Sequence, residues 1–202
     1  QWLQEIAAAI QHLQKHKLAH QDLRAANVLL SSADLATARP RVADFGLAGL
    51  RDLIAAHHTY SHTAMEWTAP EMFGGSTTQL LASDCYSFGI LMYEVLSRKM
   101  PFYGLSAAER DKIRLEQLRY TRFEFNQRLM SSFNVTEAQQ RTLWLEQRAE
   151  SLEQRRPDVS VGSIGGDRPD VLLELMQQCW ADDADERPDL NMVIAVLQSH
   201  DA

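Results

Sequence analysis

The chain has 202 residues, of which 45% are apolar and 23% charged, and its formal net charge is -7. The length and apolar content allow one sizeable core, and the charged fraction is too low for a disordered polyelectrolyte. The acidic balance argues against non-specific nucleic-acid binding, and two cysteines are too few for a disulfide framework or a metal knuckle. No apolar run approaches the roughly 20 residues that a membrane helix needs. We therefore expect a cytoplasmic protein, or the cytoplasmic part of a longer, membrane-attached one.

The first half of the chain predicts one surface helix, two short strands and one buried helix. Apolar residues recur at helical spacing over 2–17, which is typical of an amphipathic helix. The apolar run 28–30 and the segment 39–43 predict two short strands. Residues 44–71 mix Gly, His, Thr and Ser without a period, which indicates a long functional loop. The segment 84–96 is almost wholly apolar, as in a buried central helix.

The second half begins with a segment of different composition. Residues 103–155 are rich in Arg and Gln, and the last part of this segment predicts a solvated helix. The Gly- and Pro-containing stretch 156–170 predicts a loop. Two helices follow, at about 170–180 and 188–199, and Pro188 is expected in the first turn of the last one. The whole chain is therefore predicted to be mostly helical with a little sheet.

Three oxygen-bearing side chains lie close to the two predicted strands. Asp22 and Asn27 are five residues apart in the loop between the first helix and the first strand. Asp44 follows the second strand and precedes a Phe-Gly pair. Carboxylate and amide oxygens in such places suit a hard cation that phosphates also hold. A lone Asp in a loop is more often a cap or turn former, so this hypothesis depends on both motifs occurring in this order.

Five segments, in this order, resemble the motifs of a protein kinase. They are His20-Gln21-Asp22 through Asn27, Asp44-Phe45-Gly46, Ala69-Pro70-Glu71, the segment 83–97 and the segment 175–197. The resemblance is to the larger, C-terminal lobe, because the Gly-rich loop, strand Lys and helical Glu that precede it in the family have no counterpart here. The implied fold is mainly α (α+β), and residues 1–202 would be a C-terminal lobe. We expect the N-terminal lobe to be absent from this chain, and the chain to be a piece of a longer protein.

The resemblance assigns roles to the polar residues. Asp22 would accept the proton of the substrate hydroxyl and orient its oxygen for attack. Asn27, which belongs to the same catalytic loop, and Asp44 would hold the Mg²⁺ ions that bridge the phosphates of ATP. Arg24 would steady Asp22 and the charge that develops near the γ-phosphate. Leu29 would pack under the nucleotide.

Other positions are implied to be structural. Glu71 and Arg187 would form a buried ion pair that ties the segment after the long loop to the last helices. Asp84 would accept hydrogen bonds from backbone N–H groups of the catalytic loop. Core packing under the nucleotide is implied for His20, Leu29 and Phe45, and Trp180 is expected in the core.

The resemblance implies an enzyme that transfers the γ-phosphoryl group of ATP to a protein hydroxyl. LRAAN and EWTAPE resemble both the Src-type tyrosine kinases and the tyrosine-kinase-like serine/threonine group. Arg24, in place of Lys, slightly favours tyrosine as the acceptor, whereas Thr63 and Ala64 fit neither pattern. The alternative is a pseudokinase or scaffold module that signals by binding. The presence of the upstream strand Lys would discriminate between the two.

Two features depart from the family pattern. Gln21 stands where the catalytic loop usually has Arg. Residues 103–155 exceed the usual spacing between the buried helix and the next family helix, so most of that stretch is expected to be an insertion. The expected partners are a protein substrate, the N-terminal lobe of the same chain and a protein bound at the insertion, with no nucleic acid.

Overall fold

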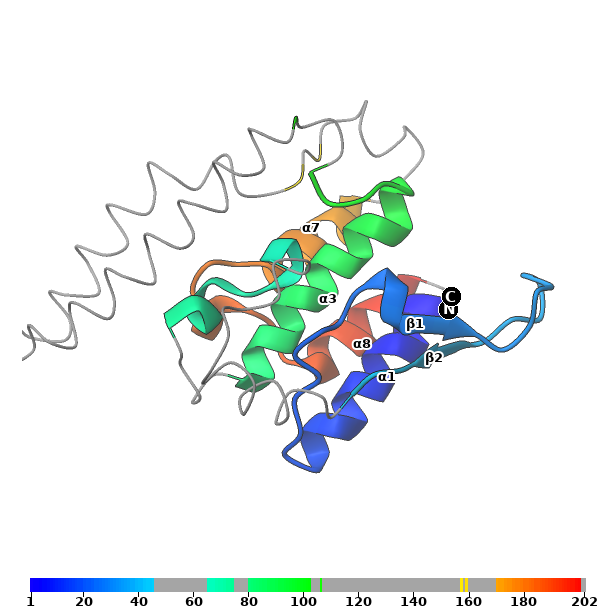
Figure 1. The fold of residues 1–202 in the computed structure, drawn as a ribbon, viewed down its shortest axis with the longest axis horizontal. Helices are drawn as coiled ribbons and strands as arrows, with labels where there is room; N and C mark the ends of the chain where they lie inside the picture. Colours follow the sequence, from blue (N-terminus) through cyan, green and yellow to red (C-terminus); the bar gives the residue numbers. More distant parts are fainter. Residues whose placement is uncertain are drawn as a thin grey trace, which may run out of the picture.

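The computed structural model describes residues 1–45, 65–74, 80–102, 106, 157, 159 and 170–200. The described helices are α1 (Trp2–Lys15), α3 (Leu80–Ser97), α7 (Asp170–Cys179) and α8 (Leu190–His200). The strands are β1 (Val28–Leu30) and β2 (Pro40–Val42), and short 3-10 turns form at η1 (Ala25–Asn27), η2 (Met65–Trp67), η3 (Pro70–Gly74) and η4 (Ala184–Glu186). The prediction of a mostly helical chain with a little sheet is confirmed (Figure 1).

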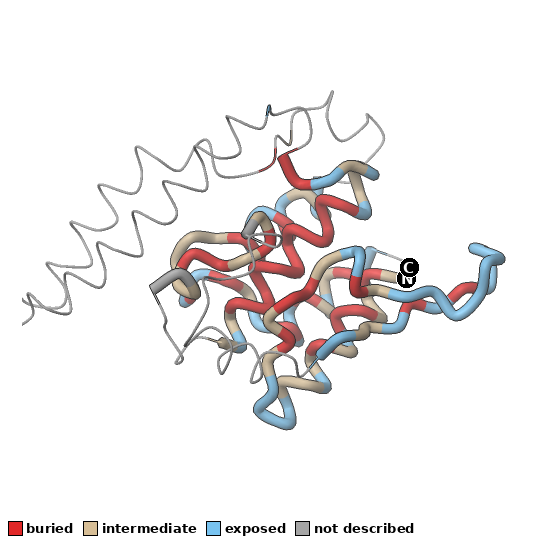
Figure 2. The backbone as a smooth tube through the Cα atoms, viewed as in Figure 1, coloured by how far each residue is buried: buried red, intermediate tan, exposed pale blue. Residues whose placement is uncertain are grey.

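Helix α3 runs through the centre of the described fold, and the other helices lie around it (Figure 1). Every side chain from Ser83 to Glu94 is buried, so all faces of the helix are covered over these residues (Figure 2). The nearly continuous apolar run 84–96 predicted this, and the helix begins four residues earlier, at Leu80. Because α3 is buried on every side, its few polar side chains need partners inside the protein.

The packing of α7 on α3 requires a glycine. A Cβ atom at Gly89 would lie 3.0 Å from the Cβ of Cys179 and 3.0 Å from the carbonyl oxygen of Met176. Such distances are tighter than ordinary side-chain contacts, so Gly89 lets the two helices approach closely. Trp180 follows α7 and is buried in the same core, as predicted.

Helix α1 buries the apolar face that its spacing predicted, at Leu3, Ile6, Ala7 and Ile10. It packs on α8, and the side chain of Gln4 donates to the carbonyl of Leu197 at 3.0 Å. The helix ends at Lys15, two residues before the predicted end, because the chain turns into a left-handed conformation at Lys17, with φ 58°. The N–H of Leu18 then bonds back to the carbonyl of Leu13, which is the Schellman arrangement.

Strands β1 and β2 pair antiparallel, with Val28 opposite Val42. Both strand predictions are confirmed, within the segments 28–30 and 39–43.

The prediction for Pro188 is wrong, because α8 begins at Leu190 and the side chain of Asp189 accepts from the N–H of Met192 at 2.8 Å. Pro188 therefore precedes the cap.

Parts of the predictions fall on residues that are not described. The solvated helix within 137–155, most of the proposed insertion 103–155 and most of the loop 156–170 lie outside the described residues. The same holds for residues 46–64, including Gly46. Within the described ranges, no helix has both the length and the apolar character that crossing a membrane requires.

Candidate active site

The loop that follows α1 is fixed to the start of α3 by one buried carboxylate. Asp84 accepts the N–H of His20 at 2.7 Å and the N–H of Gln21 at 2.8 Å, one on each oxygen. Burial raises the pKa of Asp84 to about 6, although the two hydrogen bonds act in the opposite direction. The prediction that Asp84 accepts backbone donors from this loop is confirmed.

His20 connects the loop to the end of β2. Its Nε2 lies 2.9 Å from the carbonyl oxygen of Ala43, and its Nδ1 accepts the N–H of Asp22 at 3.3 Å. Together these contacts select the neutral tautomer with the proton on Nε2. Burial lowers the pKa of His20, while the bond to Ala43 and the charges of Asp22 and Asp44 oppose this effect. His20 is buried in the core, as predicted.

Asp22 and Asn27 are in direct contact. The Nδ2 of Asn27 donates to the backbone carbonyl of Asp22 at 2.7 Å and to its Oδ2 at 2.9 Å. Both residues are buried, and η1 provides the turn that brings Asn27 back toward Asp22. These bonds use the amide nitrogen of Asn27, so the amide oxygen is not engaged by them.

Asp44 lies at the end of β2, next to this loop. The preceding residue, Ala43, is held on both sides, because its N–H donates to the carbonyl of Asn27 at 2.9 Å and its carbonyl accepts from His20. Asp44 itself is exposed and has φ 61°, in the left-handed region. These bonds of Ala43 hold the backbone next to Asp44 against Asn27 and His20, and the metal-binding role of Asp44 stays a prediction.

Arg24 lies between Asp22 and an aromatic ring. Its Nε is 3.6 Å from Oδ1 of Asp22, and its guanidinium carbon is 5.8 Å from the ring centre of Trp67. Arg24 thus lies within ion-pair distance of Asp22, and its catalytic role stays a prediction.

Glu94 is a site residue that the sequence analysis missed. Its Oε2 accepts the N–H of Ala25 at 2.9 Å and the indole N–H of Trp67 at 2.8 Å. Burial raises the pKa of Glu94, whereas these bonds and the charge of Arg24 act to lower it. The sequence did contain a signal, since Glu94 and Asp84 are the two charged residues of α3 in an otherwise mostly apolar stretch.

Leu29 and Phe45 are not covered by the core of the described residues, and their packing under the nucleotide stays a prediction. Leu29 is 57% exposed and Phe45 is 55% exposed. Side chains alternate between the two faces of a strand. Val28 and Val42 pack against the core, and Leu29 therefore points to the opposite face of the sheet. Leu29, which is opposite Arg41 in the sheet, is thus an apolar residue that the core does not cover.

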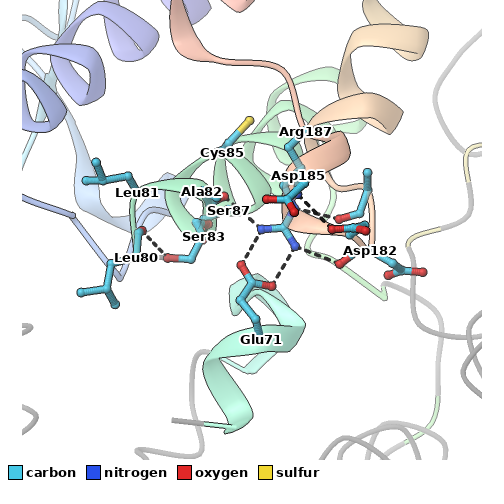
Figure 3. A network of polar contacts seen from close by, with 12 residues as sticks. Glu71, Leu80, Leu81, Ala82, Ser83, Cys85, Ser87, Asp182, Asp185 and Arg187 are labelled. Atoms are coloured by element: carbon cyan, nitrogen blue, oxygen red, sulfur yellow. Dashed lines mark hydrogen bonds and ion pairs between the residues drawn. The ribbon is translucent and has the colours of Figure 1, made fainter. Parts of the chain in front are cut away.

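The predicted ion pair between Glu71 and Arg187 is confirmed (Figure 3). The two guanidinium nitrogens Nη1 and Nη2 lie 2.5 and 2.8 Å from the carboxylate oxygens of Glu71. Arg187 also donates to the backbone carbonyls of Ala82, Ala181 and Asp182. One buried side chain thus joins η3 to the start of α3 and to the segment that follows α7.

The chain belongs to the protein kinase domain family, whose sequence pattern matches residues 1–197. It is 29% identical over 106 residues to the mitogen-activated protein kinase kinase kinase dlk-1 of Caenorhabditis elegans. This match covers 52% of this chain and 11% of the relative. It is 33% identical over 111 residues to the tyrosine-protein kinase FRK of Homo sapiens. This match covers 52% of this chain and 21% of the relative. The matched part is therefore a small share of both relatives.

Proposed function

We propose that this chain is the C-terminal lobe of an active protein kinase, which transfers the γ-phosphoryl group of ATP to a protein hydroxyl. The observation that supports this proposal is the convergence of Asp22, Asn27 and Asp44. Asn27 is bonded to Asp22, and Ala43, the neighbour of Asp44, is bonded to Asn27. A scaffold that only binds a partner has no chemical need for these three oxygen-bearing side chains at one place.

The residues fit a magnesium nucleotide. The amide oxygen of Asn27 and the exposed carboxylate of Asp44 are the hard ligands that Mg²⁺ prefers. Leu29 presents an apolar side chain on the outer face of β1, where it would pack against the nucleotide. When bound, the magnesium nucleotide supplies the phosphoryl group and neutralises much of its charge.

The side chains of the catalytic loop would orient the substrate hydroxyl, accept its proton and stabilise the developing charge. Asp22 would accept the proton of the substrate hydroxyl and orient its oxygen, since the bond from Asn27 fixes the carboxylate. Arg24, 3.6 Å from Asp22, would steady that carboxylate and the charge that develops during transfer. The same Arg24 is the basis for proposing tyrosine, with a slight preference, over serine or threonine as the acceptor.

The test is phosphotransfer by the parent protein that carries this chain together with its upstream sequence. Asp22→Asn should reduce turnover by at least about 10²-fold, the range for losing a positioned base. Asp34→Asn is the matched control, because Asp34 lies exposed in the turn between β1 and β2. Full activity of Asp22→Asn would refute the assignment of the catalytic loop.

Two further outcomes bear on the same proposal. An inactive wild-type parent that binds partners normally would favour the pseudokinase alternative. The 202-residue chain alone should be a poor enzyme, because phosphoryl transfer depends on positioning that the proposed missing lobe would complete. Efficient turnover by the isolated chain would refute the lobe assignment.

A further inference from the structure

The end of helix α1 carries two histidines on one face. His12 lies in the last turn, and His16 caps the C-terminus of the helix four residues later. Residues at this spacing are neighbours on a helix surface. Both histidines are exposed, at the edge of the described fold (Figure 2). Their ring centres are 4.5 Å apart and the ring planes are tilted by 50°. The two imidazoles are therefore adjacent and open to solvent.

A hydrogen bond determines which nitrogen of His16 can act as a ligand. Its Nδ1 lies 2.9 Å from the backbone carbonyl oxygen of His12. A carbonyl oxygen only accepts, so Nδ1 donates, and the lone pair of the neutral ring is on Nε2. Metal-bound histidines commonly donate their other ring N–H to a backbone carbonyl in this way. The ring of His16 is thus held in a form that can bind a metal ion.

The separation of the rings fits one shared ion. With metal–nitrogen bonds of about 2.0–2.1 Å, two imidazoles on one ion have ring centres about 4.5–5.3 Å apart. The observed 4.5 Å is at the short end of this range. The C-terminal end of a helix also carries a partial negative charge, which favours a cation there. The ammonium of Lys15 acts against it, but this group is bonded to Gln11 at 2.9 Å and screened by water.

We propose that His12 and His16 form a binding site for a late first-row divalent metal ion of the zinc and copper class. Imidazole nitrogens are typical ligands of these ions, whereas Mg²⁺ prefers oxygen. Among the described residues no group of three or more His, Cys, Asp or Glu side chains could hold a metal, so water completes the coordination of this pair. The bound ion joins the two ends of one helical turn and stabilises the end of α1. The inference does not depend on phosphoryl transfer.

Calorimetric titration of the 202-residue chain with Zn²⁺ tests the proposal. The starting chain carries His57→Gln, His58→Gln and His62→Gln, because these three histidines lie outside the described residues and could bind the probe elsewhere. At about pH 7.5, where imidazole is mostly neutral, the starting chain should bind one Zn²⁺. Adding His12→Gln or His16→Gln should weaken the affinity at least about tenfold, because each change removes one of two protein ligands.

His200→Gln is the matched control. His200 is also an exposed histidine in the last turn of a helix, but Val196 stands four residues before it, so its face carries no second imidazole. This variant should leave the affinity for Zn²⁺ within about twofold, as expected for a distant site. His12→Gln combined with Gln11→His keeps the number of histidines but puts them five residues apart. That spacing places them on different faces, and binding should not return.

The binding data can overturn the proposal in three ways. The starting chain could fail to bind Zn²⁺. His12→Gln and His16→Gln could both keep the starting affinity within about twofold, the scatter expected of changes at independent sites. His200→Gln could lose as much affinity as they do. Each of these results would show that the pair in α1 is not a metal site.

Thermal unfolding and NMR measure the effect of the ion on α1. With Zn²⁺ at about ten times its dissociation constant, the Tm of the starting chain should rise by about 3–6 °C. The rise should disappear in His12→Gln. Zn²⁺ should also move the ring signals of His12 and His16 and leave those of the buried His20 in place. A chain that binds Zn²⁺ without moving the first two signals would hold the metal elsewhere and refute the site.

Discussion

Replacing Glu71 with alanine should lower the free energy of unfolding by about 3–5 kcal/mol, because it leaves a buried guanidinium without its counter-charge. The side chain of Arg187 is 1% exposed, and that of Glu71 is 11% exposed. Water therefore cannot replace the lost carboxylate. Both oxygens of Glu71 accept from Arg187, so the variant removes two charge-assisted bonds at once.

The contacts that remain in Glu71→Ala limit the loss but do not remove it. Arg187 keeps its bonds to the carbonyls of Ala82, Ala181 and Asp182, and it stays 5.2 Å from the ring centre of Tyr86. These partners satisfy the guanidinium donors without neutralising the charge. At roughly 2–4 °C per kcal/mol for a chain of this size, the Tm should fall by about 6–20 °C.

Thermal and urea unfolding of four variants would measure this effect. Arg187→Met alone should also be costly, because it leaves the carboxylate of Glu71, which is 11% exposed, without its counter-charge. The double variant should cost less than the sum of the two single changes, since no unpaired charge remains. Glu5→Ala is the matched control: Glu5 pairs with Arg39 at 2.8 Å at an exposed site, and such pairs contribute at most about 1 kcal/mol. A loss in Glu71→Ala no greater than in this control, or strict additivity, would refute the reasoning.

Three other changes have defined outcomes. Gly89→Ala should destabilise the chain by about 1–3 kcal/mol through overpacking, although alanine is the better helix former. A higher urea midpoint for the variant would contradict the close approach of α3 and α7 at Gly89. The stability advantage of wild type over His20→Asn should shrink as the pH falls through about 6.5. Burial lowers the pKa of His20 in the folded state, so the unfolded chain binds the proton first; urea titrations at about pH 7.5 and 5.5 check this. Replacing the hydroxyl residues within 59–63, which lie outside the described residues, should reduce turnover of the parent less than roughly tenfold, because Gln21 carries no positive charge that a phosphate on this segment could neutralise. A hundredfold loss in a peptide assay would contradict this prediction.

The sequence alone predicted those elements that depend on residues close together in the chain. The spacing of Leu3, Ile6 and Ile10 set the buried face of α1, and the unbroken apolar run set the burial of α3. The resemblance to protein kinases implied that Asp84 binds backbone donors of the catalytic loop, and a charged residue inside such a run needs partners of this kind. In these cases one stretch of chain contained enough information.

The features that were missed depend on residues far apart in the chain. Glu94 binds Trp67, which is 27 residues away, and Ala25, which is 69 residues away, and no local period encodes either contact. The exposure of Leu29 follows from a strand whose other face already packs on the core. The end of α1 was misplaced because Lys17 adopts a left-handed conformation that its residue type does not predict.

The hydrogen bonds that shape the catalytic loop also stabilise a strained backbone conformation at Gln21. Gln21 has φ 63°, a region that costs a residue with a Cβ on the order of 1–3 kcal/mol. The bond from its N–H to the buried carboxylate of Asp84 is charge-assisted and offsets this cost. Because the bond is made by the backbone, an amide and a guanidinium side chain at this position leave the loop in the same shape. The change from the usual Arg to Gln21 therefore keeps this backbone bond while it removes a positive charge from the loop. The shape of the loop, which α3 fixes, can be retained while the charge at this position varies.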